Sequence, residues 1–305
     1  MKQKVILAGG SGFLGRSLSP VLFSRGYDVI VLGRGKPRRD GSVEHLQWDG
    51  KTLGAWAAGL DGAKAIVNFT GRMVNCRYTA ENRREIMDSR VDSVRVLGEA
   101  IAQCSTPPEA FVQAGSLAIY GNAGERWCDE EAPHGTGFPV EVCERWEEAF
   151  GQVNAPATRK SVLRIGFALG RGGGVIDFLA RLTRWFLGGH VGNGRQFISW
   201  IHVADLNRMF MQCIEDAQLS GAYNATSPDP VTNAEFMREL RRVLRRPWSP
   251  PVPAPIAHLG AWLMGTEASL ALTGRRCTPR RFIQHGFTFE FPNLGDALAD
   301  IYPRS

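Results

Sequence analysis

Long apolar runs are absent from this chain of 305 residues. Its hydrophobic stretches are interrupted by Arg, Gly or Asp before they reach the ~18 residues that mark a membrane-spanning helix. The start, MKQK and an apolar segment over residues 5–8, imitates a secretory leader only until Gly9, and the apolar part is too short for one. We therefore expect a soluble, cytoplasmic protein with no membrane partner.

Cysteines are few and widely spaced. They form no Cys-x-x-Cys pair and no grouping with histidine at metal-ligand spacing, which argues against both a disulfide framework and a zinc site. We expect reduced thiols and no metal. The six positions are Cys76, Cys104, Cys128, Cys143, Cys213 and Cys277.

Strong clustering of charge is also missing. The formal net charge is +6, and arginine pairs such as Arg241-Arg242 and Arg275-Arg276 are dispersed along the chain. No basic stripe with interleaved aromatic residues marks a nucleic-acid surface, and solvated helix faces account for most of the pairs. Nucleic acid is therefore not expected as a partner, whereas a small phosphate-bearing molecule is compatible with the charge.

A glycine loop stands near the start of the chain. The string GGSGFLG begins at Gly9, between an apolar strand over residues 4–8 and a helical pattern over residues 13–25. In this order Gly9 permits the tight turn, Gly12 lets a pyrophosphate approach the backbone, and Gly15 lets the helix pack on the strand. The helix N-terminus then faces the phosphates, so the loop predicts a dinucleotide site.

Strand and helix patterns alternate after this loop, which predicts an α/β fold with a Rossmann-type, doubly wound parallel sheet. The predicted strands cover residues 29–32, 43–48, 65–69, 110–114 and 161–166, and the predicted helices cover 79–104, 140–150, 175–186, 205–216 and 233–245. Five prolines over residues 247–255 predict an extended connector. We expect a nucleotide-binding domain over residues 1–170 and a smaller C-terminal α/β substrate lobe over residues 171–305, with some exchange of segments between the lobes.

The end of the second predicted strand bears on the choice of cofactor. NAD-binding folds usually carry an acidic residue there for the ribose hydroxyls, but this strand ends at Gly33-Arg34. A guanidinium at this point can pair with a 2′-phosphate. NADP(H) is therefore favoured over NAD, with a merely solvated Arg34 as the alternative.

Two more strand ends carry polar residues. Thr70-Gly71 follow the fourth strand and Ser116 follows the fifth, at the carboxyl edge where ligands bind in open α/β sheets. Ser116 could hydrogen-bond a substrate carbonyl or hydroxyl group. A serine in a turn is the equally weighted alternative.

Motifs along nearly the whole chain resemble those of atypical extended short-chain dehydrogenases/reductases, the NADP-binding epimerase-like branch with a C-terminal domain of unassigned role. They are GGSGFLG at residues 9–15, SRVDS at 89–93, GSLAIYG at 115–121, VCERWE at 142–147, RIGFALGRGGG at 164–174 and GNGRQFISWIHVADL at 192–206. The resemblance implies a substrate cleft between two lobes and a homodimer, as in many relatives.

The resemblance also implies roles for individual residues. Arg195 and Trp200 would line the substrate cleft with Ser116 and Tyr120, while His202 is either a further lining residue or structural. The implied NADP(H) contacts are Gly9, Gly12, Phe13, Leu14, Gly15, Gly33, Arg34, Thr70, Gly71 and Arg164.

The catalytic pair departs from the family pattern. Ordinary members carry Tyr-x-x-x-Lys, whereas the matching helix here has Cys143 and Glu147. A glutamate raises the pKa of a neighbouring acid, where the lysine lowers it. Our leading hypothesis is an NADP(H)-dependent oxidoreductase or epimerase-like enzyme for a small hydroxyl, carbonyl or nucleotide-sugar-type substrate, with Ser116 assisted by Tyr120 or Cys143. The alternative is a non-catalytic NADP(H)-binding sensor.

Overall fold

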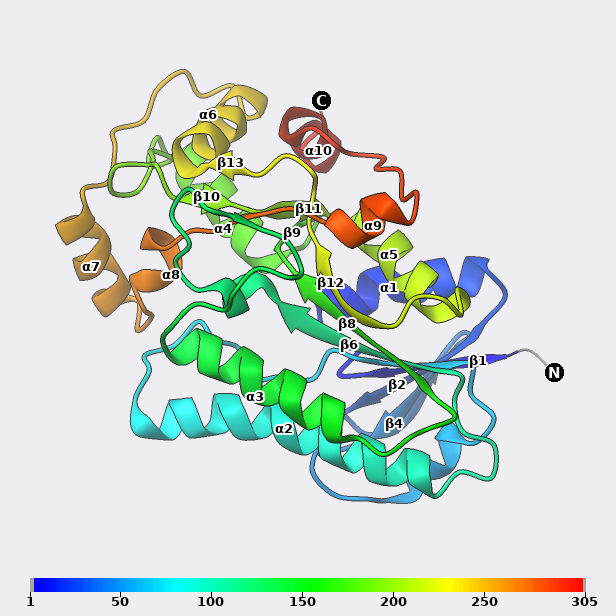
Figure 1. The fold of residues 1–305 in the computed structure, drawn as a ribbon. Coiled ribbons are helices and arrows are strands. Elements are labelled where there is room, and N and C mark those ends of the chain that lie inside the picture. Colours follow the sequence, from blue (N-terminus) through cyan, green and yellow to red (C-terminus); the bar gives the residue numbers. More distant parts are fainter. Residues whose placement is uncertain (1–2, 304–305) are drawn as a thin grey trace.

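The computed structural model describes residues 3–303, and a single eight-stranded sheet organises most of them (Figure 1). The strand order is β12-β8-β6-β5-β1-β2-β4-β3, and neighbouring strands are parallel except β3 and β4. The bounds are β1 (Lys4–Ala8), β2 (Asp28–Gly33), β3 (Arg38–Asp40), β4 (Val43–Gln47), β5 (Ala65–Asn68), β6 (Ala110–Ser116), β8 (Arg159–Ile165) and β12 (Gly221–Ala225). The predicted doubly wound α/β fold is confirmed.

Apolar side chains on both faces explain why the central strands are buried. Along β1, Val5 and Leu7 join one core cluster, while Ile6 and Ala8 join another, because successive residues of a strand point to opposite faces. Helices α1 (Phe13–Ser24) and α5 (Val203–Glu215) cover the first face. Helices α2 (Ala80–Ala102) and α3 (Phe138–Gln152) lie side by side on the second (Figure 1).

Two strands of the eight-stranded sheet were not predicted. β3 is a short antiparallel edge of exposed charged residues, which has no apolar pattern to reveal it. β12 comes from the second half of the chain, yet it extends the Rossmann sheet by pairing with β8. Segments beyond Gly170 therefore complete the nucleotide-binding half.

The rest of the second half packs around its own apolar cluster, which includes Trp200, Phe236 and Leu298. The proline segment runs extended only to Pro253, so the predicted connector ends two residues early, and helix α7 (Ala254–Leu263) begins with Pro255 in its first turn. The further elements are β7 (Trp127–Cys128), β9 (Phe167–Leu169), α4 (Gly174–Arg184), β10 (Phe197–Ile198), β11 (Trp200–His202), β13 (Val231–Thr232), α6 (Asn233–Val243), α7 (Ala254–Leu263), α8 (Ser269–Leu272), β14 (Arg276–Cys277), α9 (Arg280–Gln284) and α10 (Leu294–Ile301), with 3-10 helices η1 (Ala55–Leu60) and η2 (Leu117–Tyr120).

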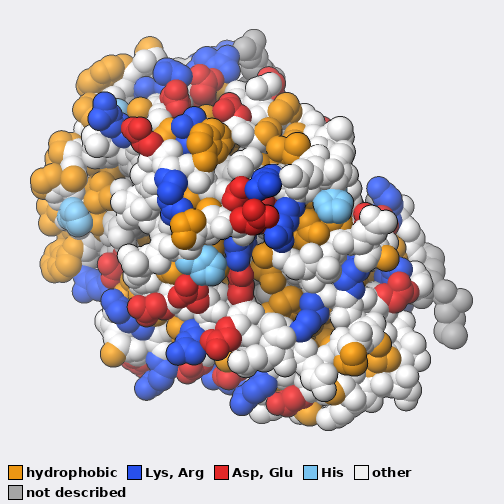
Figure 2. All heavy atoms as spheres, in the orientation of Figure 1, with side chains coloured by type: hydrophobic (Ala, Val, Ile, Leu, Met, Phe, Trp, Pro, Cys, Tyr) orange, Lys and Arg blue, Asp and Glu red, His pale blue; other side chains and the backbone are white. Residues whose placement is uncertain are grey.

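The outer side of α7 is apolar. Ile256, Leu259 and Leu263 are exposed there, and Figure 2 shows hydrophobic side chains gathered along the margin of the molecule where Figure 1 places this helix. Within residues 3–303, none of the helices combines the length and hydropathy needed to cross a bilayer.

Candidate functional site

The glycine loop brings the start of α1 against the end of β1. Gly9 adopts a left-handed conformation with φ +69°. A Cβ on Gly15 would lie 2.2 Å from the carbonyl oxygen of Gly10, so helix and loop are in backbone contact. At Gly12, in contrast, the nearest atom is Gly9 O at 3.8 Å, and no side chain caps the helix. The loop therefore leaves free N–H groups beside open space, which is what an anionic ligand requires.

The polar groups around the loop point to the same ligand class. The Thr70 hydroxyl is buried and has no hydrogen-bond partner among residues 3–303, and it lies 2.9 Å from the Cβ position of Gly9. Gly33 ends β2 close to Ser11 of the loop, 3.8 Å from Cβ position to Oγ. Arg34 is exposed next to it, and no hydrogen bond or ion pair within residues 3–303 holds its side chain. A hydroxyl and a guanidinium are the kinds of groups that bind a phosphorylated ribose.

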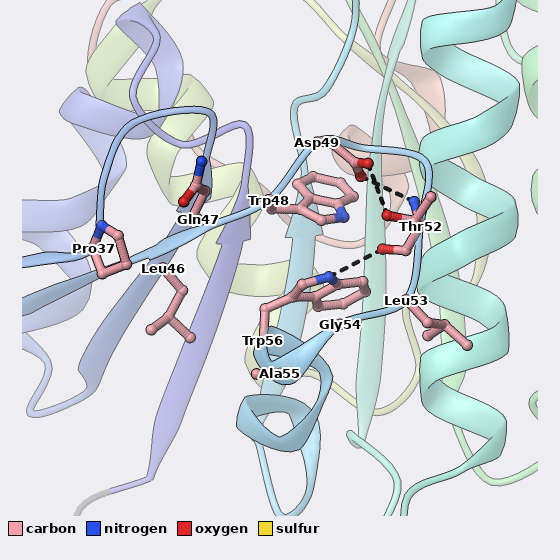
Figure 3. A pocket seen from close by; sticks show the side chains of 10 residues that line it. All are labelled: Pro37, Leu46, Gln47, Trp48, Asp49, Thr52, Leu53, Gly54, Ala55 and Trp56. Carbon is pink, nitrogen blue, oxygen red and sulfur yellow. Dashed lines mark hydrogen bonds between the residues drawn. The ribbon is translucent and has the colours of Figure 1, made fainter.

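A pocket at the carboxyl end of β4 was not predicted. Its volume is about 470 Å³, and Pro37, Leu46, Trp48 and Trp56 supply apolar walls (Figure 3). Asp49 shapes its rim, because the carboxylate accepts hydrogen bonds from the backbone N–H groups of the following turn at 2.8 and 2.9 Å. The sequence signal was Trp48-Asp49-Gly50, which begins at the last residue of the third predicted strand.

A buried ion pair occupies the place of the family's catalytic lysine. Both oxygens of Glu147 accept hydrogen bonds from Arg164, each at 2.8 Å. Arg164 also donates to the hydroxyl of Tyr120 at 2.9 Å and is 5% exposed. The structure thus places the Arg164 guanidinium in contacts within the protein, and its cofactor contact stays a prediction.

Tyr120 belongs to the same network. It is fully buried, and its hydroxyl donates to Asn224 Oδ1 at 2.8 Å. Burial raises the pKa of Tyr120 to about 12, although Arg164 acts in the opposite direction. The phenol therefore holds its proton at neutral pH and contacts β12 rather than an open cleft.

Cys143 lies on α3 one helical turn before Glu147 and is 4% exposed. Burial and then the Glu147 carboxylate raise the pKa of this thiol to about 12, while Arg90 and Arg275 lower it. This is the direction of shift that the sequence predicts for a carboxylate in place of the lysine. Cys143 is thus a neutral thiol.

Cys143 is expected to resist alkylation in the folded protein. At pH 9, a thiol with a pKa near 12 is ionised in only about one molecule in a thousand, and the thiolate is the reactive form. Iodoacetamide should therefore modify half-buried Cys76 at least ~100-fold faster than Cys143, as measured by peptide mass spectrometry. Buried Cys213 is the matched slow control; equal rates for Cys76 and Cys143 would contradict the assignment.

Among the other predicted site residues, Ser116 can still contact a substrate, whereas Trp200 and His202 have roles within the protein. Ser116 ends β6 half-buried, and its Oγ accepts the Ala118 N–H at 3.1 Å, which leaves the hydroxyl proton free to donate. Trp200 is a correction, because it is fully buried in the core with its indole N–H donated to Asp229 O. His202 is structural, since its Nδ1 caps α5. Arg195 is exposed.

One arginine pair was misread. Arg275 and Arg276 do not lie on a solvated helix face. Arg276 is on β14, and its guanidinium stacks between the rings of Trp127 and Phe197, 4.0 and 4.7 Å from their centroids. Arg275 donates from Nε to Gly121 O at 3.2 Å. Only the folding of the C-terminal segment onto the loop after η2 places these side chains near the site.

Comparisons with known proteins agree with this geometry. Residues 5–225 match the model of the NAD dependent epimerase/dehydratase family, and residues 252–301 match a domain of unknown function, DUF1731. The chain is 34% identical to the epimerase family protein SDR39U1 of Bos taurus, over 98% of this chain and 99% of that protein.

Solved structures extend the comparison. The crystal structure of human epimerase family protein SDR39U1 (isoform 2) with NADPH superposes with a TM-score of 0.88 at 30% identity, covering 98% of this chain and 99% of that one. A nucleoside-diphosphate sugar epimerase from Corynebacterium glutamicum gives a TM-score of 0.79 at 29% identity, over 99% of this chain and 58% of that chain.

Proposed function

Since the chain belongs to the NAD dependent epimerase/dehydratase family, we propose that it binds NADP(H) and acts as an oxidoreductase or epimerase-like enzyme on a small hydroxyl, carbonyl or nucleotide-sugar-type substrate. The observation that carries the cofactor is the open, uncapped loop at Gly12, together with Arg34 at the end of β2, whose side chain makes no hydrogen bond or ion pair in the part of the chain that the structure describes. The human relative solved with NADPH supports the same choice.

The chain's residues fit this cofactor as follows. The free N–H groups at the start of α1 would hold the pyrophosphate, and Arg34 would pair with the adenosine 2′-phosphate. Thr70 and Gly71 would contact the ribose, and the pocket of Trp48 and Trp56 offers apolar walls to the adenine. The bound nicotinamide would supply hydride transfer at C4.

In this proposal, catalysis at the nicotinamide end of the site depends on Ser116. Among the three predicted catalytic side chains, Tyr120 and Cys143 hold their protons to about pH 12, which is far from the neutral range where acid–base catalysis is efficient. The Ser116 hydroxyl is free to donate a hydrogen bond to a substrate oxygen. We infer that Ser116 orients the substrate, and that an acid supplied by the substrate itself or by water completes the proton transfer.

Replacing Arg34 tests the cofactor. Arg34→Ala is expected to weaken NADPH binding by about 10–100-fold, since charge-assisted hydrogen bonds to the 2′-phosphate are lost, while NADH binding should hardly change. Isothermal titration calorimetry measures both. Arg39→Ala, an exposed arginine on β3, is the matched control. Equal affinities of the wild-type protein for NADPH and NADH would refute the NADP preference.

A non-catalytic NADP(H) sensor is the second candidate, favoured by the Glu147–Arg164 pair and the high pKa of Cys143. The two candidates differ in turnover. Incubation with NADPH and a panel of carbonyl compounds and nucleotide sugars should oxidise NADPH or form epimers if the protein is an enzyme. Binding without turnover, together with a partner captured only in one redox state of the cofactor, would support the sensor.

We also propose that the protein is cytoplasmic and forms a homodimer. The six cysteines are free thiols in the structure, as expected in a reducing compartment such as the cytoplasm. A homodimer is the assembly that we expect, and light scattering of the purified protein tests it.

A further inference from the structure

Arg90 lies on α2, beneath the loop that follows β5. Its guanidinium carbon is 3.0 Å from the Cβ position of Gly71, and it packs over the ring of Trp146 at 5.0 Å. Nη1 donates to the carbonyl oxygens of Arg72 and Ile86, each at 3.0 Å. The side chain is thus fixed between the proposed ribose site and α3.

Arg275 reaches the same region from the C-terminal segment. Its backbone N–H donates to Phe197 O at 3.0 Å and its carbonyl accepts from the Ser199 hydroxyl at 2.9 Å, which anchor the residue. The side chain uses Nε for Gly121 O. Within residues 3–303, its two terminal nitrogens make no hydrogen bond, and they are not sealed in the core.

Both guanidinium groups lie against α3 or the element packed on it: Arg90 stacks over Trp146 of α3, and Arg275 donates to Gly121 O at the end of η2, which contacts α3. Each also lowers the pKa of Cys143, on the same helix α3. Neither has an ion pair with a carboxylate among the described residues. The ionisable groups that act on Arg275 are the thiols of Cys277, Cys143 and Cys128, and those that act on Arg90 are Cys143 and Tyr78. Burial lowers the pKa of both arginines.

Two half-buried cations without a carboxylate partner are unusual, since charges removed from water are normally paired. Arg164 shows the usual arrangement of a buried cation, because both carboxylate oxygens of Glu147 accept hydrogen bonds from its guanidinium. The strongest internal candidate for a counter-ion is Cys128, whose pKa is lowered to about 7, first by a hydrogen bond from Cys277. Cys128 is among the groups that act on Arg275 but not among those that act on Arg90, so it is not a counter-ion for both cations.

We propose that Arg90 and Arg275 bind an anionic group of the substrate, a carboxylate or a phosphate ester placed next to the carbon that reacts beside Ser116. This inference rests on the proposed function and narrows its substrate to small hydroxy or oxo compounds with a negative charge near the reacting carbon. Arg275 supplies the unused pair of guanidinium nitrogens for a bidentate contact. Arg90 adds a second positive charge from the nucleotide-binding half.

Three molecules with a shared scaffold test the inference: glycerate, glycerol 3-phosphate and glycerol. Each is titrated by calorimetry into wild-type protein saturated with NADP⁺. We expect at least one of the two anions to bind and glycerol not to bind, and the stronger anion distinguishes a carboxylate site from a phosphate site. Arg275→Gln should weaken binding of the anion by about 10–100-fold. Arg275→Lys keeps the positive charge but loses the paired guanidinium nitrogens, so its affinity for the anion should lie between those of the wild type and Arg275→Gln.

Controls separate this site from the cofactor and from folding. Arg280→Gln, an exposed arginine paired with Asp129 and Glu131, should bind the anion as the wild type does. Arg275→Gln should keep its NADPH affinity, because the proposed cofactor contacts lie elsewhere, and should stay folded, because the side chain is half-buried and makes one hydrogen bond, to Gly121 O; its melting temperature checks the folding. Failure of NADPH to bind would overturn the proposed function. Normal NADPH binding with no anion binding, equal binding of glycerol, or unchanged anion binding in Arg275→Gln would overturn the anionic substrate alone.

Discussion

Gly15→Ala is expected to abolish NADPH binding and to destabilise the protein by at least about 3 kcal/mol, the upper range for overpacking. The added methyl group would lie 2.2 Å from the Gly10 carbonyl oxygen and 2.4 Å from its Cα. These are backbone atoms, so relief requires α1 to move away from the loop. That movement would displace the N–H groups on which the phosphates depend. Urea unfolding measures the stability, and calorimetry measures the binding.

Gly12→Ala is the matched control on the same loop. Its methyl group would have no neighbour nearer than 3.8 Å, so the stability should stay within about 1 kcal/mol of wild type. The methyl group would instead fill the space that a pyrophosphate needs, and NADPH affinity should fall. A Gly12→Ala protein with wild-type affinity would mean that the phosphates do not approach this position.

Introducing the lysine of ordinary family members at position 147 is expected to lower the free energy of unfolding. Glu147→Lys would remove the bidentate partner of buried Arg164 and place a second cation beside it. Breaking a buried ion pair typically costs about 3–5 kcal/mol, and repulsion adds to this. Chemical unfolding at neutral pH measures the loss. The usual catalytic pair therefore cannot be rebuilt by substitution at this site alone.

Two variants make that result interpretable. Glu148→Lys changes the neighbouring exposed carboxylate, which pairs with Arg145, and should cost no more than about 1 kcal/mol. Glu147→Gln keeps the shape and removes only the charge, so it should fall between the other two. A Glu147→Lys protein that is as stable as wild type would show that Arg164 does not depend on this carboxylate.

Local patterns were sufficient to predict the nucleotide-binding half apart from β3 and β12. The loop from Gly9 to Gly15 and the alternating apolar strands each lie within one short stretch of chain, so their periodicity determines their structure. The place of Arg34 at the end of the second strand could be predicted for the same reason, because it directly follows β2. Even the effect of Glu147 on Cys143 could be predicted, since the two lie on one turn of a helix.

The surroundings of the predicted catalytic residues could not be predicted in the same way. Whether Trp200 lines a cleft or fills a core depends on α6 and α10, which follow it far along the chain. Arg275 enters the site only because its segment pairs with residues near Phe197 and Gly121. Tyr120 was misjudged because its partner Asn224 is more than a hundred residues away. Contacts between distant segments leave no periodicity in the sequence.

The position of β12 has a consequence for synthesis of the chain. A nascent polypeptide released from the ribosome as far as Gly170 would already contain the glycine loop, but β8 would present an unpaired edge until residues 221–225 emerged. Such edges promote misassociation between chains. The nucleotide-binding half therefore cannot mature before much of the second lobe has been translated, and a gene fragment ending near codon 170 should yield an insoluble product rather than a free-standing domain.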